Sequence, residues 1–163
     1  MEPARVAALQ RMPIFGGIRA EVLQFLVDQA STVSVCAGAY FFREHDQAQS
    51  MFVLEAGRVA VLKLWNGQEH LLAHLGQGDC FGEMALMDLF PRSASVRALE
   101  ACSALELAAS AFYGLYQKDL EQFALIQMNL GREVSRRLRV ADERLFRLRM
   151  GAPSAEAEEG PLT

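Results

Sequence analysis

The chain carries two kinds of apolar pattern, one with helical spacing and one made of short runs. Near the N-terminus, apolar residues recur three or four positions apart within residues 2–12 and again within residues 19–30. Residues with this spacing share one face of an α-helix, so we predict N-terminal helices within residues 1–31. Pro13 and the glycines after it separate the two helices, because proline removes a backbone donor and clashes with the preceding turn.

The middle of the chain, residues 32–109, predicts β-structure. Here apolar residues lie in short runs separated by turn formers such as Gly38, Gly57 and the pair Asn66-Gly67. An Asn-Gly pair between two apolar runs is a strong signal for a type I′ hairpin, because both residues tolerate positive φ. Short strands with regular turns are typical of a β-sandwich or barrel. Together with the helices, they place the chain in the α+β class.

Helical spacing returns after residue 109 and continues to about Met150. In the last helix, apolar residues alternate steps of four and three at Val134, Leu138, Ala141, Leu145 and Leu148. This seam covers about two heptads, fewer than an independent coiled coil needs. It makes the helices of residues 110–150 a candidate surface for a homodimer. The remainder, residues 151–163, is small and acidic, and we expect a disordered tail there.

Composition narrows the class of protein. The chain has 163 residues, of which 52% are apolar, and a formal net charge of −4. Its length and apolar content fit one globular domain with a real core. The mild charge gives no reason to expect nucleic acid as a partner of this chain. Without a long apolar run or an apolar N-terminal stretch, we expect no membrane partner and a cytoplasmic location.

The three cysteines give no sign of a metal or redox centre. Cys36, Cys80 and Cys102 lie far apart and form no C-x-x-C pair. Free cysteines in a reducing compartment usually behave as small buried apolar residues, and we expect that of all three.

Candidate chemistry gathers in one segment, Phe81-Gly82-Glu83-Met84-Ala85-Leu86, followed shortly by Pro91-Arg92-Ser93-Ala94-Ser95. The guanidinium of Arg92 can donate two parallel hydrogen bonds to phosphate oxygens. The carboxylate of Glu83 only accepts, which suits a sugar hydroxyl. Gly82 allows the backbone a close approach, and a helical turn beginning near Glu83 would point free N–H groups at an anion. These residue types together predict a site for a sugar phosphate.

This segment resembles the phosphate-binding cassette of the cyclic nucleotide-binding domain family, which includes catabolite activator proteins and kinase regulatory subunits. The family pattern is F-G-E-(apolar)-A-L, a short variable stretch, then P-R-(S/T/A)-A-(T/S). Gly57-Arg58-Val59 and the turn at residues 76–79 fit its flanks, and the resemblance covers roughly residues 6–148. It implies one domain over residues 1–150, with a jelly-roll barrel (a double-stranded β-helix) at 32–109. Within it, residues 81–95 form the cassette. Helices at 1–31 and B- and C-type helices at 110–150 flank the barrel.

The resemblance also implies the ligand, cAMP or cGMP, and no further cofactor. It gives the ribose 2′-hydroxyl to Glu83 and the exocyclic phosphate oxygens to Arg92. The other residues that it places at the ligand are Phe81, Gly82, Met84, Ala85, Ser93 and Ala94. An alanine at the position of Ser93 suggests cAMP and a threonine suggests cGMP, so serine leaves the base open.

By the same resemblance, the C-terminal helices act as a lid over the base. Arg132, Arg136 and Arg137 lie at a suitable distance along the chain to stack on the purine or donate to it. For each one alone, a solvated basic face with a partner four positions away, such as Glu133 for Arg137, is the more common role. The expected function is a sensor whose lid helices rearrange on binding and present a different face to an unknown protein partner.

Two other functions stay open. One is a module of the same fold that binds no ligand and uses its Arg-rich helix to dimerise or dock. The other is a metal-dependent cupin enzyme, since cupins are also jelly rolls, but His45, His70 and His74 form no H-x-H pair. With no nucleophile paired to a base, we expect binding without catalysis. No helix-turn-helix pattern follows the last helix, which suggests a stand-alone module.

Overall fold

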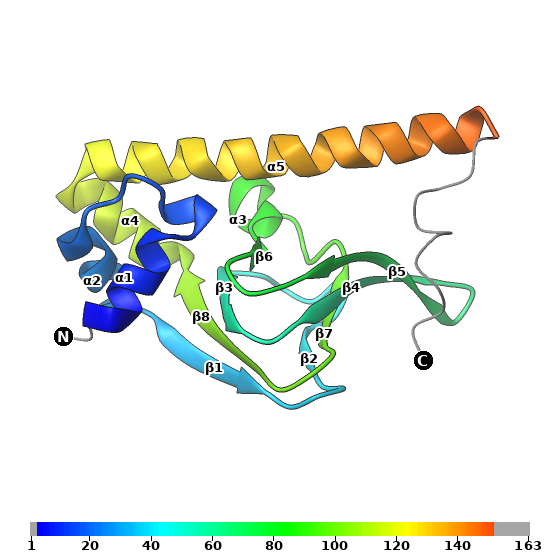
Figure 1. Ribbon diagram of the computed structural model, residues 1–163, viewed down its shortest axis with the longest axis horizontal. Helices are drawn as coiled ribbons and strands as arrows, with labels where there is room; N and C mark the ends of the chain where they lie inside the picture. Colours follow the sequence, from blue (N-terminus) through cyan, green and yellow to red (C-terminus); the bar gives the residue numbers. More distant parts are fainter. Residues whose placement is uncertain (1–2, 152–163) are drawn as a thin grey trace.

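Two four-stranded antiparallel sheets form the centre of the molecule, a computed structural model that describes residues 3–151 (Figure 1). The strands are β1 (Ser31–Val35), β2 (Tyr40–Phe42), β3 (Ser50–Ala56), β4 (Val59–Trp65), β5 (Gln68–Leu75), β6 (Cys80–Phe81), β7 (Ser95–Ala98) and β8 (Cys102–Ala108). Their orders are β1-β8-β3-β6 and β2-β7-β4-β5. The jelly-roll expectation is confirmed as a sandwich; no ladder joins the two sheets within residues 3–151, so the barrel is not closed.

The β4–β5 hairpin has the turn that its sequence predicts. Asn66 and Gly67 adopt φ values of 51° and 75°, as a type I′ turn requires. The strands pair in register from Trp65 opposite Gln68 to Val59 opposite Leu75, with one irregularity after Val61. This hairpin is the longest ladder of its sheet and extends beyond the sandwich (Figure 1).

The core has two parts, one between the sheets and one under the helices. Between the sheets, the rings of Phe52 and Phe81 stack with centroids 5.3 Å apart, and Phe41 meets both edge-on. Under the helices, fully buried residues of the helices and of β3 and β8 pack together, among them Leu23 and Leu105. Strand β8 can contribute side chains to both parts of the core, because successive side chains of a strand point to opposite faces.

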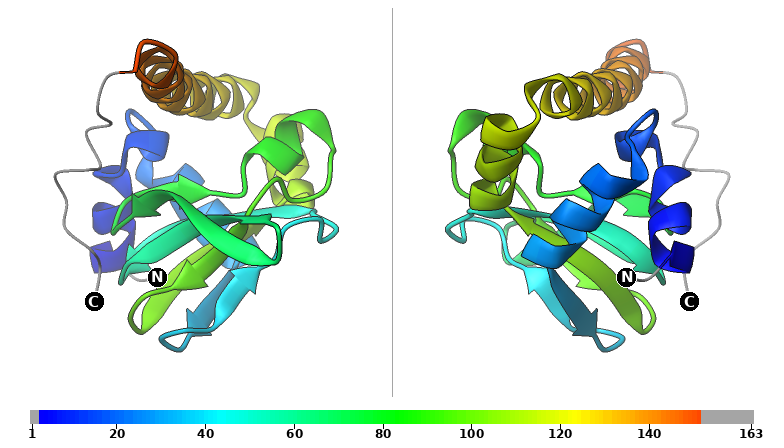
Figure 2. Two further views of the ribbon diagram at one scale, coloured as in Figure 1. Left: turned by 90° about the vertical axis from the view of Figure 1, so that its right-hand side faces the viewer. Right: turned by 90° about the vertical axis from the view of Figure 1, so that its left-hand side faces the viewer.

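The helical elements within residues 3–151 gather on one side of the sandwich (Figure 1). They are α1 (Pro3–Gln10), the 3-10 turn η1 (Pro13–Phe15), α2 (Ala20–Gln29), α3 (Met84–Asp88), α4 (Ala109–Lys118) and α5 (Leu120–Arg149). The longest, α5, is one continuous helix of 30 residues. Figure 2 looks along α5 and shows η1 and α1 to one side of it and α3 and α4 to the other. Within residues 3–151, no helix has both the length and the apolar character that a membrane span requires.

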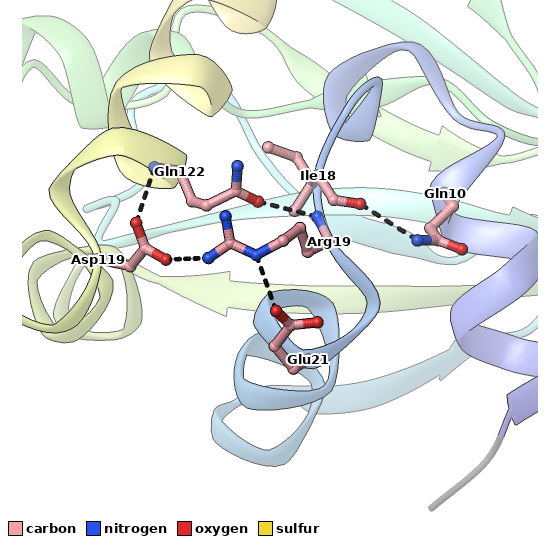
Figure 3. Close-up of polar contacts among 6 residues, drawn as sticks. All are labelled: Gln10, Ile18, Arg19, Glu21, Asp119 and Gln122. Atoms are coloured by element: carbon pink, nitrogen blue, oxygen red, sulfur yellow. Dashed lines mark hydrogen bonds and ion pairs between the residues drawn. The ribbon is translucent and has the colours of Figure 1, made fainter.

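A polar joint fixes the start of α5 to the N-terminal helices (Figure 3). Asp119 caps α5, because its Oδ1 accepts from the backbone N–H of Gln122 at 3.1 Å. Its other oxygen lies 2.5 Å from Nη2 of Arg19, the residue before α2. The backbone N–H of Arg19 in turn donates to Oε1 of Gln122 at 2.8 Å. The turn between α4 and α5 is thereby tied to the segment that leads into α2.

The cysteines differ from their expected common burial. Cys80 and Cys102 are buried, whereas Cys36 is exposed, so the expectation fails for Cys36. Cys36 directly follows β1, at the turn before β2, where the chain leaves the core. Burial raises the pKa of the Cys80 thiol to about 12, with the charge of Glu83 acting in the same direction. Burial also raises the pKa of Cys102.

We therefore predict that a thiol-alkylating reagent at about pH 8 modifies Cys36 alone in the folded protein, because the thiolate is the reactive form. Intact-mass measurement should find one adduct on the native chain and three after denaturation, which exposes Cys80 and Cys102 as well. Native labelling of Cys80 as fast as that of Cys36 would contradict the burial described for β6.

Candidate functional site

A cavity of about 340 Å³ lies where α3, the β4–β5 hairpin and α5 meet. Its walls are mostly apolar, with a few charged groups that converge on the space. The lining residues are Phe42, Val61, Lys63, Leu72, Ala73, Leu75, Phe81, Gly82, Glu83, Met84, Ala85, Arg92, Ser93, Ala94, Val96 and Arg137. A largely apolar pocket of this volume with a few fixed polar groups is typical of a small-molecule site.

Arg92 supplies a buried positive charge to this cavity. The residue is only 5% exposed, and its guanidinium lies over the ring of Phe42 at 4.0 Å. Nη1 donates to the carbonyl of Gly82 at 3.0 Å and Nη2 to the hydroxyl of Ser50 at 3.4 Å. Nε is buried and has no partner within the described chain. Burial lowers the pKa of Arg92 from its ordinary value, while the carboxylates of Glu106, Asp46 and Glu83 oppose that shift.

Gly82 and the short helix α3 shape the wall opposite the guanidinium. Gly82 has a φ of +79°, which favours glycine, and a Cβ on it would lie 2.5 Å from Nη1 of Arg92 and push the guanidinium aside. After Glu83, α3 begins at Met84. The first N–H groups of a helix have no carbonyl partner within it, so those of Met84 and Ala85 are suited to an anion.

Glu83 joins the cavity to the last helix. It is 5% exposed, and its Oε1 lies 3.2 Å from Nη1 of Arg137 on α5. Arg137 also donates through Nη2 to the carbonyl of Cys80 at 2.6 Å and lies 3.3 Å through Nε from Glu133, one turn earlier. One arginine of α5 therefore holds the acidic residue of the cavity, the strand β6 and its own helix together.

The segment that carries Arg92 rests on the loop between β2 and β3. The backbone of Arg92 pairs with this loop at both groups: its N–H donates to Asp46 at 2.9 Å and its carbonyl accepts from His45 at 2.8 Å. His45 has a φ of 73°, a value that few residues other than glycine adopt. Lys63 then fixes the next residue, because Nζ donates to the carbonyl of Ser93 at 2.8 Å.

Glu44 secures Lys63 in that position. Its carboxylate accepts from Nζ of Lys63 at 2.9 Å and from the backbone N–H of Leu64 at 3.0 Å. These contacts, the Leu64 N–H first, lower the pKa of Glu44. The N–H of Glu44 donates to Oγ of Ser95 at 2.8 Å. The loop and the arginine segment thus form one hydrogen-bonded unit.

All eight cassette positions singled out in the sequence line this one cavity. They are Phe81, Gly82, Glu83, Met84, Ala85, Arg92, Ser93 and Ala94. Of the three candidate lid arginines, Arg137 lines the cavity. Arg132 instead donates to Asn129 at 3.1 Å, and Arg136 pairs with Glu133.

Sequence reasoning missed Phe42, Lys63 and the apolar wall from β4 and β5. These residues lie far from the cassette in sequence, and the only signal for them was the strand alternation that places Val61 and Lys63 on one face. Within residues 3–151, no three His, Cys, Asp or Glu side chains gather as a metal site would need.

The fold and the site define a jelly-roll-like domain with a cavity suited to a small molecule, and comparison with known proteins gives the family. The model of the cyclic nucleotide-binding domain family matches residues 32–119, so the chain belongs to this family. The family is one of regulatory binding domains, not of enzymes.

Two curated relatives illustrate the likeness. The cyclic AMP receptor protein of Thermus thermophilus is 32% identical over 131 residues, which are 80% of this chain and 59% of the relative. The cAMP-dependent protein kinase regulatory subunit of Blastocladiella emersonii is 30% identical over 107 residues, which are 65% of this chain and 27% of the relative. The chain thus spans less than two thirds of either relative.

Two solved structures show the same likeness in their fold. The catabolite activator protein of Thermus thermophilus matches with a TM-score of 0.73 and 32% identity, covering 83% of this chain and 62% of that one. The regulatory domain of Toxoplasma gondii PKA, crystallised with cAMP, matches with a TM-score of 0.62 and 27% identity, covering 67% of this chain and 42% of that one.

Replacing Gly82 with alanine tests the contact between the cassette turn and Arg92. The new Cβ displaces the guanidinium, and for any anionic nucleotide that binds this cavity we expect the dissociation constant to rise by about tenfold or more in calorimetry. Gly38→Ala is the matched control: Gly38 has a φ of +85° and open space around its Cβ position. Both variants should lose about 1–2 kcal/mol of stability to backbone strain. Equal affinities in the two variants would show that the position of Arg92 does not matter.

Proposed function

We propose that this chain binds a cyclic nucleotide, cAMP or cGMP, in the cavity and signals occupancy through α5. One observation carries the proposal: the guanidinium of Arg92 is buried without an ion pair within the described chain and retains an unpartnered N–H. A buried charge without a direct ion pair is costly, and the carboxylates of Glu106, Asp46 and Glu83 offset this cost only in part, so the site is suited to an anion. A cyclic phosphodiester carries one negative charge and fits that requirement.

The neighbouring groups suit the rest of such a ligand. Glu83 accepts the ribose 2′-hydroxyl, and Arg92 donates to the exocyclic phosphate oxygens. The N–H groups of Met84, Ala85, Ser93 and Ala94 complete the phosphate shell. The base lies against the apolar wall from β4 and β5, which includes Val61 and Leu72. The names of the two relatives and the cAMP in the Toxoplasma gondii structure support the same class of ligand.

Coupling to α5 follows from Arg137. This side chain holds Glu83 at 3.2 Å, and Glu83 is also the proposed partner of the ribose. A ligand that engages Glu83 changes what Arg137 contacts, and so favours one arrangement of α5 over another. Such a shift requires unequal affinity of the ligand for the two arrangements, which this shared carboxylate provides.

The central test is calorimetric titration of the full chain with cAMP and with cGMP, beside Arg92→Ala. Removing the guanidinium takes away the counter-charge, and we expect a loss of about 2–5 kcal/mol of binding free energy with the fold intact by circular dichroism. Lys118→Met is a control that removes a cation far from the cavity, where Lys118 lies over the ring of Phe25. Absence of saturable binding by the folded native chain would favour the second candidate, a module that binds no ligand.

We also propose that the chain dimerises through α5. Leu138, Leu145 and Leu148 of the heptad seam are 59%, 51% and 67% exposed, an unusual state for three leucines on one face. Pairing two such helices buries them in the manner of a short coiled coil.

Sedimentation tests the dimer. Leu145→Asp places a charge on the seam and should shift the chain to a monomer, while Val140→Asp, a change on the same helix off the seam, should leave the dimer intact. We expect the dimer to weaken by about 2 kcal/mol or more, the cost of burying an unpaired polar group. A native chain that stays monomeric at high concentration, with and without cAMP, would remove this proposal.

A further inference from the structure

The N-terminal helices enclose a cavity that is separate from the one at Arg92. It has a volume of about 530 Å³, and the two cavities share no lining residue. Its walls come from α1, α2 and the end of α4, and they include Val6, Ala7, Gln24, Phe25, Asp28 and Lys118. The proposed function makes no use of this N-terminal cavity, so a molecule bound there would be a second ligand of the chain.

Two opposite charges lie in the wall of the N-terminal cavity without an ion pair. Asp28 accepts a hydrogen bond from Nε2 of Gln24 at 2.8 Å, and Nζ of Lys118 lies over the ring of Phe25 at 4.4 Å. Neither charge has an oppositely charged partner within residues 3–151. Because Phe25 and Asp28 are one turn apart on the same face of α2, both charges flank one part of the cavity. A molecule that carries both signs of charge can pair with both groups at once.

Asp28 is the less favourably placed of the two charges. It lies in the last turn of α2, which contains no basic residue, and the C-terminal end of a helix carries partial negative charge. Lys118 lies in the last turn of α4, where the same effect favours a cation. An ammonium group at Asp28 would therefore supply the positive charge that this end of α2 lacks.

Gln24 holds Asp28 in place and leaves its own oxygen unsatisfied. Oε1 of Gln24 is buried and accepts no hydrogen bond within the part of the chain that the structure describes. A buried acceptor without a donor lowers stability. An ammonium group has three donors, so one that is bound to Asp28 can also serve the neighbouring amide when that side chain turns toward it.

Glu21, the second acid in the wall, is already neutralised. Its carboxylate lies 2.7 Å from Nε of Arg19, which also pairs with Asp119 (Figure 3). The charges that remain for a ligand are therefore one anion, Asp28, and one cation, Lys118. A ligand with one charge of each sign leaves the cavity electrically balanced, whereas a simple cation or anion satisfies only half of it.

We propose that the N-terminal cavity binds a free amino acid with an apolar side chain. The ammonium group of the ligand pairs with Asp28, its carboxylate pairs with Lys118, and its side chain packs against Val6 and Ala7. Burial of that side chain adds hydrophobic free energy, which an inorganic ion would not gain. The inference is independent of the proposed function, because no residue belongs to both cavities.

NMR titration of the isotope-labelled full chain with L-leucine tests the site. We expect saturable shifts of amides in residues 3–10 and 20–28, with a dissociation constant on the order of 1 mM for a ligand of this size. Amides of the cassette, residues 81–95, should not shift. Isoamylamine lacks the carboxylate of leucine and isocaproate lacks its ammonium group, so each should bind at least about fivefold more weakly. Absence of saturation, shifts centred on the cassette, or equal affinity for either fragment would overturn the inference.

Asp28→Asn and Lys118→Met are the variants that remove one charge each. Asparagine keeps an acceptor for Gln24, and methionine keeps the apolar length of lysine. Each change should raise the dissociation constant for L-leucine by about fivefold or more. Glu100→Gln is the matched control, since it removes an exposed acid between β7 and β8, far from this cavity in sequence.

The amide spectrum of each variant reports whether it is folded. If folded Asp28→Asn and Lys118→Met bind L-leucine as tightly as Glu100→Gln does, the assignment of these two residues is wrong. Titration of Lys118→Met with cAMP and cGMP separates the two proposals, because loss of leucine binding should leave any nucleotide binding unchanged.

Discussion

The buried charge of Arg92 is the constraint on which the rest of the cavity depends. A guanidinium in an apolar setting needs every available partner, and the protein supplies the carbonyl of Gly82, the hydroxyl of Ser50 and the face of Phe42. None of these is an anion. Burial lowers the pKa of Arg92, which means that the charged guanidinium is less stable here than in water. An anionic ligand removes that cost, and this difference is available as binding free energy.

The residues around Arg92 are restrained in ways that hold its guanidinium in place. Gly82 has a positive φ that favours glycine, the backbone N–H and carbonyl of Arg92 pair with the loop at 43–46, and Lys63 binds the carbonyl of the following residue, Ser93. A side chain positioned in this way loses little entropy when an anion arrives. The arrangement also explains why the acidic residues near Arg92 stand off from it. Glu83 turns instead to Arg137, so the cavity keeps a carboxylate and a guanidinium that act separately.

The cassette could be predicted from sequence because its residues are close together along the chain, so that local geometry brings them to one wall. Phe42, Lys63 and the loop at 43–46 could not, because only the pairing of β2 with β7 and of β4 with β7 brings them near Arg92. The contacts of the candidate lid arginines could not be predicted from the sequence either. Arg132, Arg136 and Arg137 are all within six residues, and the sequence does not fix the rotation of α5. Burial of Ile126, Asn129 and Leu130 sets that rotation and turns Arg137 toward Glu83. Strand spacing was enough to predict a sandwich or barrel. It could not decide between them, because the pattern does not specify which strands pair, and the two sheets remain separate within residues 3–151.

Under the proposed function, the uneven burial of α5 would let a small ligand act as a switch: Ile126 and Leu130 are buried, whereas the residues from Leu138 to Arg149 are exposed. A core helix buried along its whole length would need many kcal/mol to move, more than a ligand gains by preferring one state. Shifting a two-state equilibrium from 1:99 to 99:1 takes about 5.5 kcal/mol of differential binding. Charged side chains are among the contacts that restrain the second half of α5, and one of them, Arg137, holds Glu83, the proposed partner of the ligand. On this proposal, the free energy needed to move that half is within reach of the charge neutralised at Arg92, while the half of α5 that is buried under the helices keeps the fold unchanged.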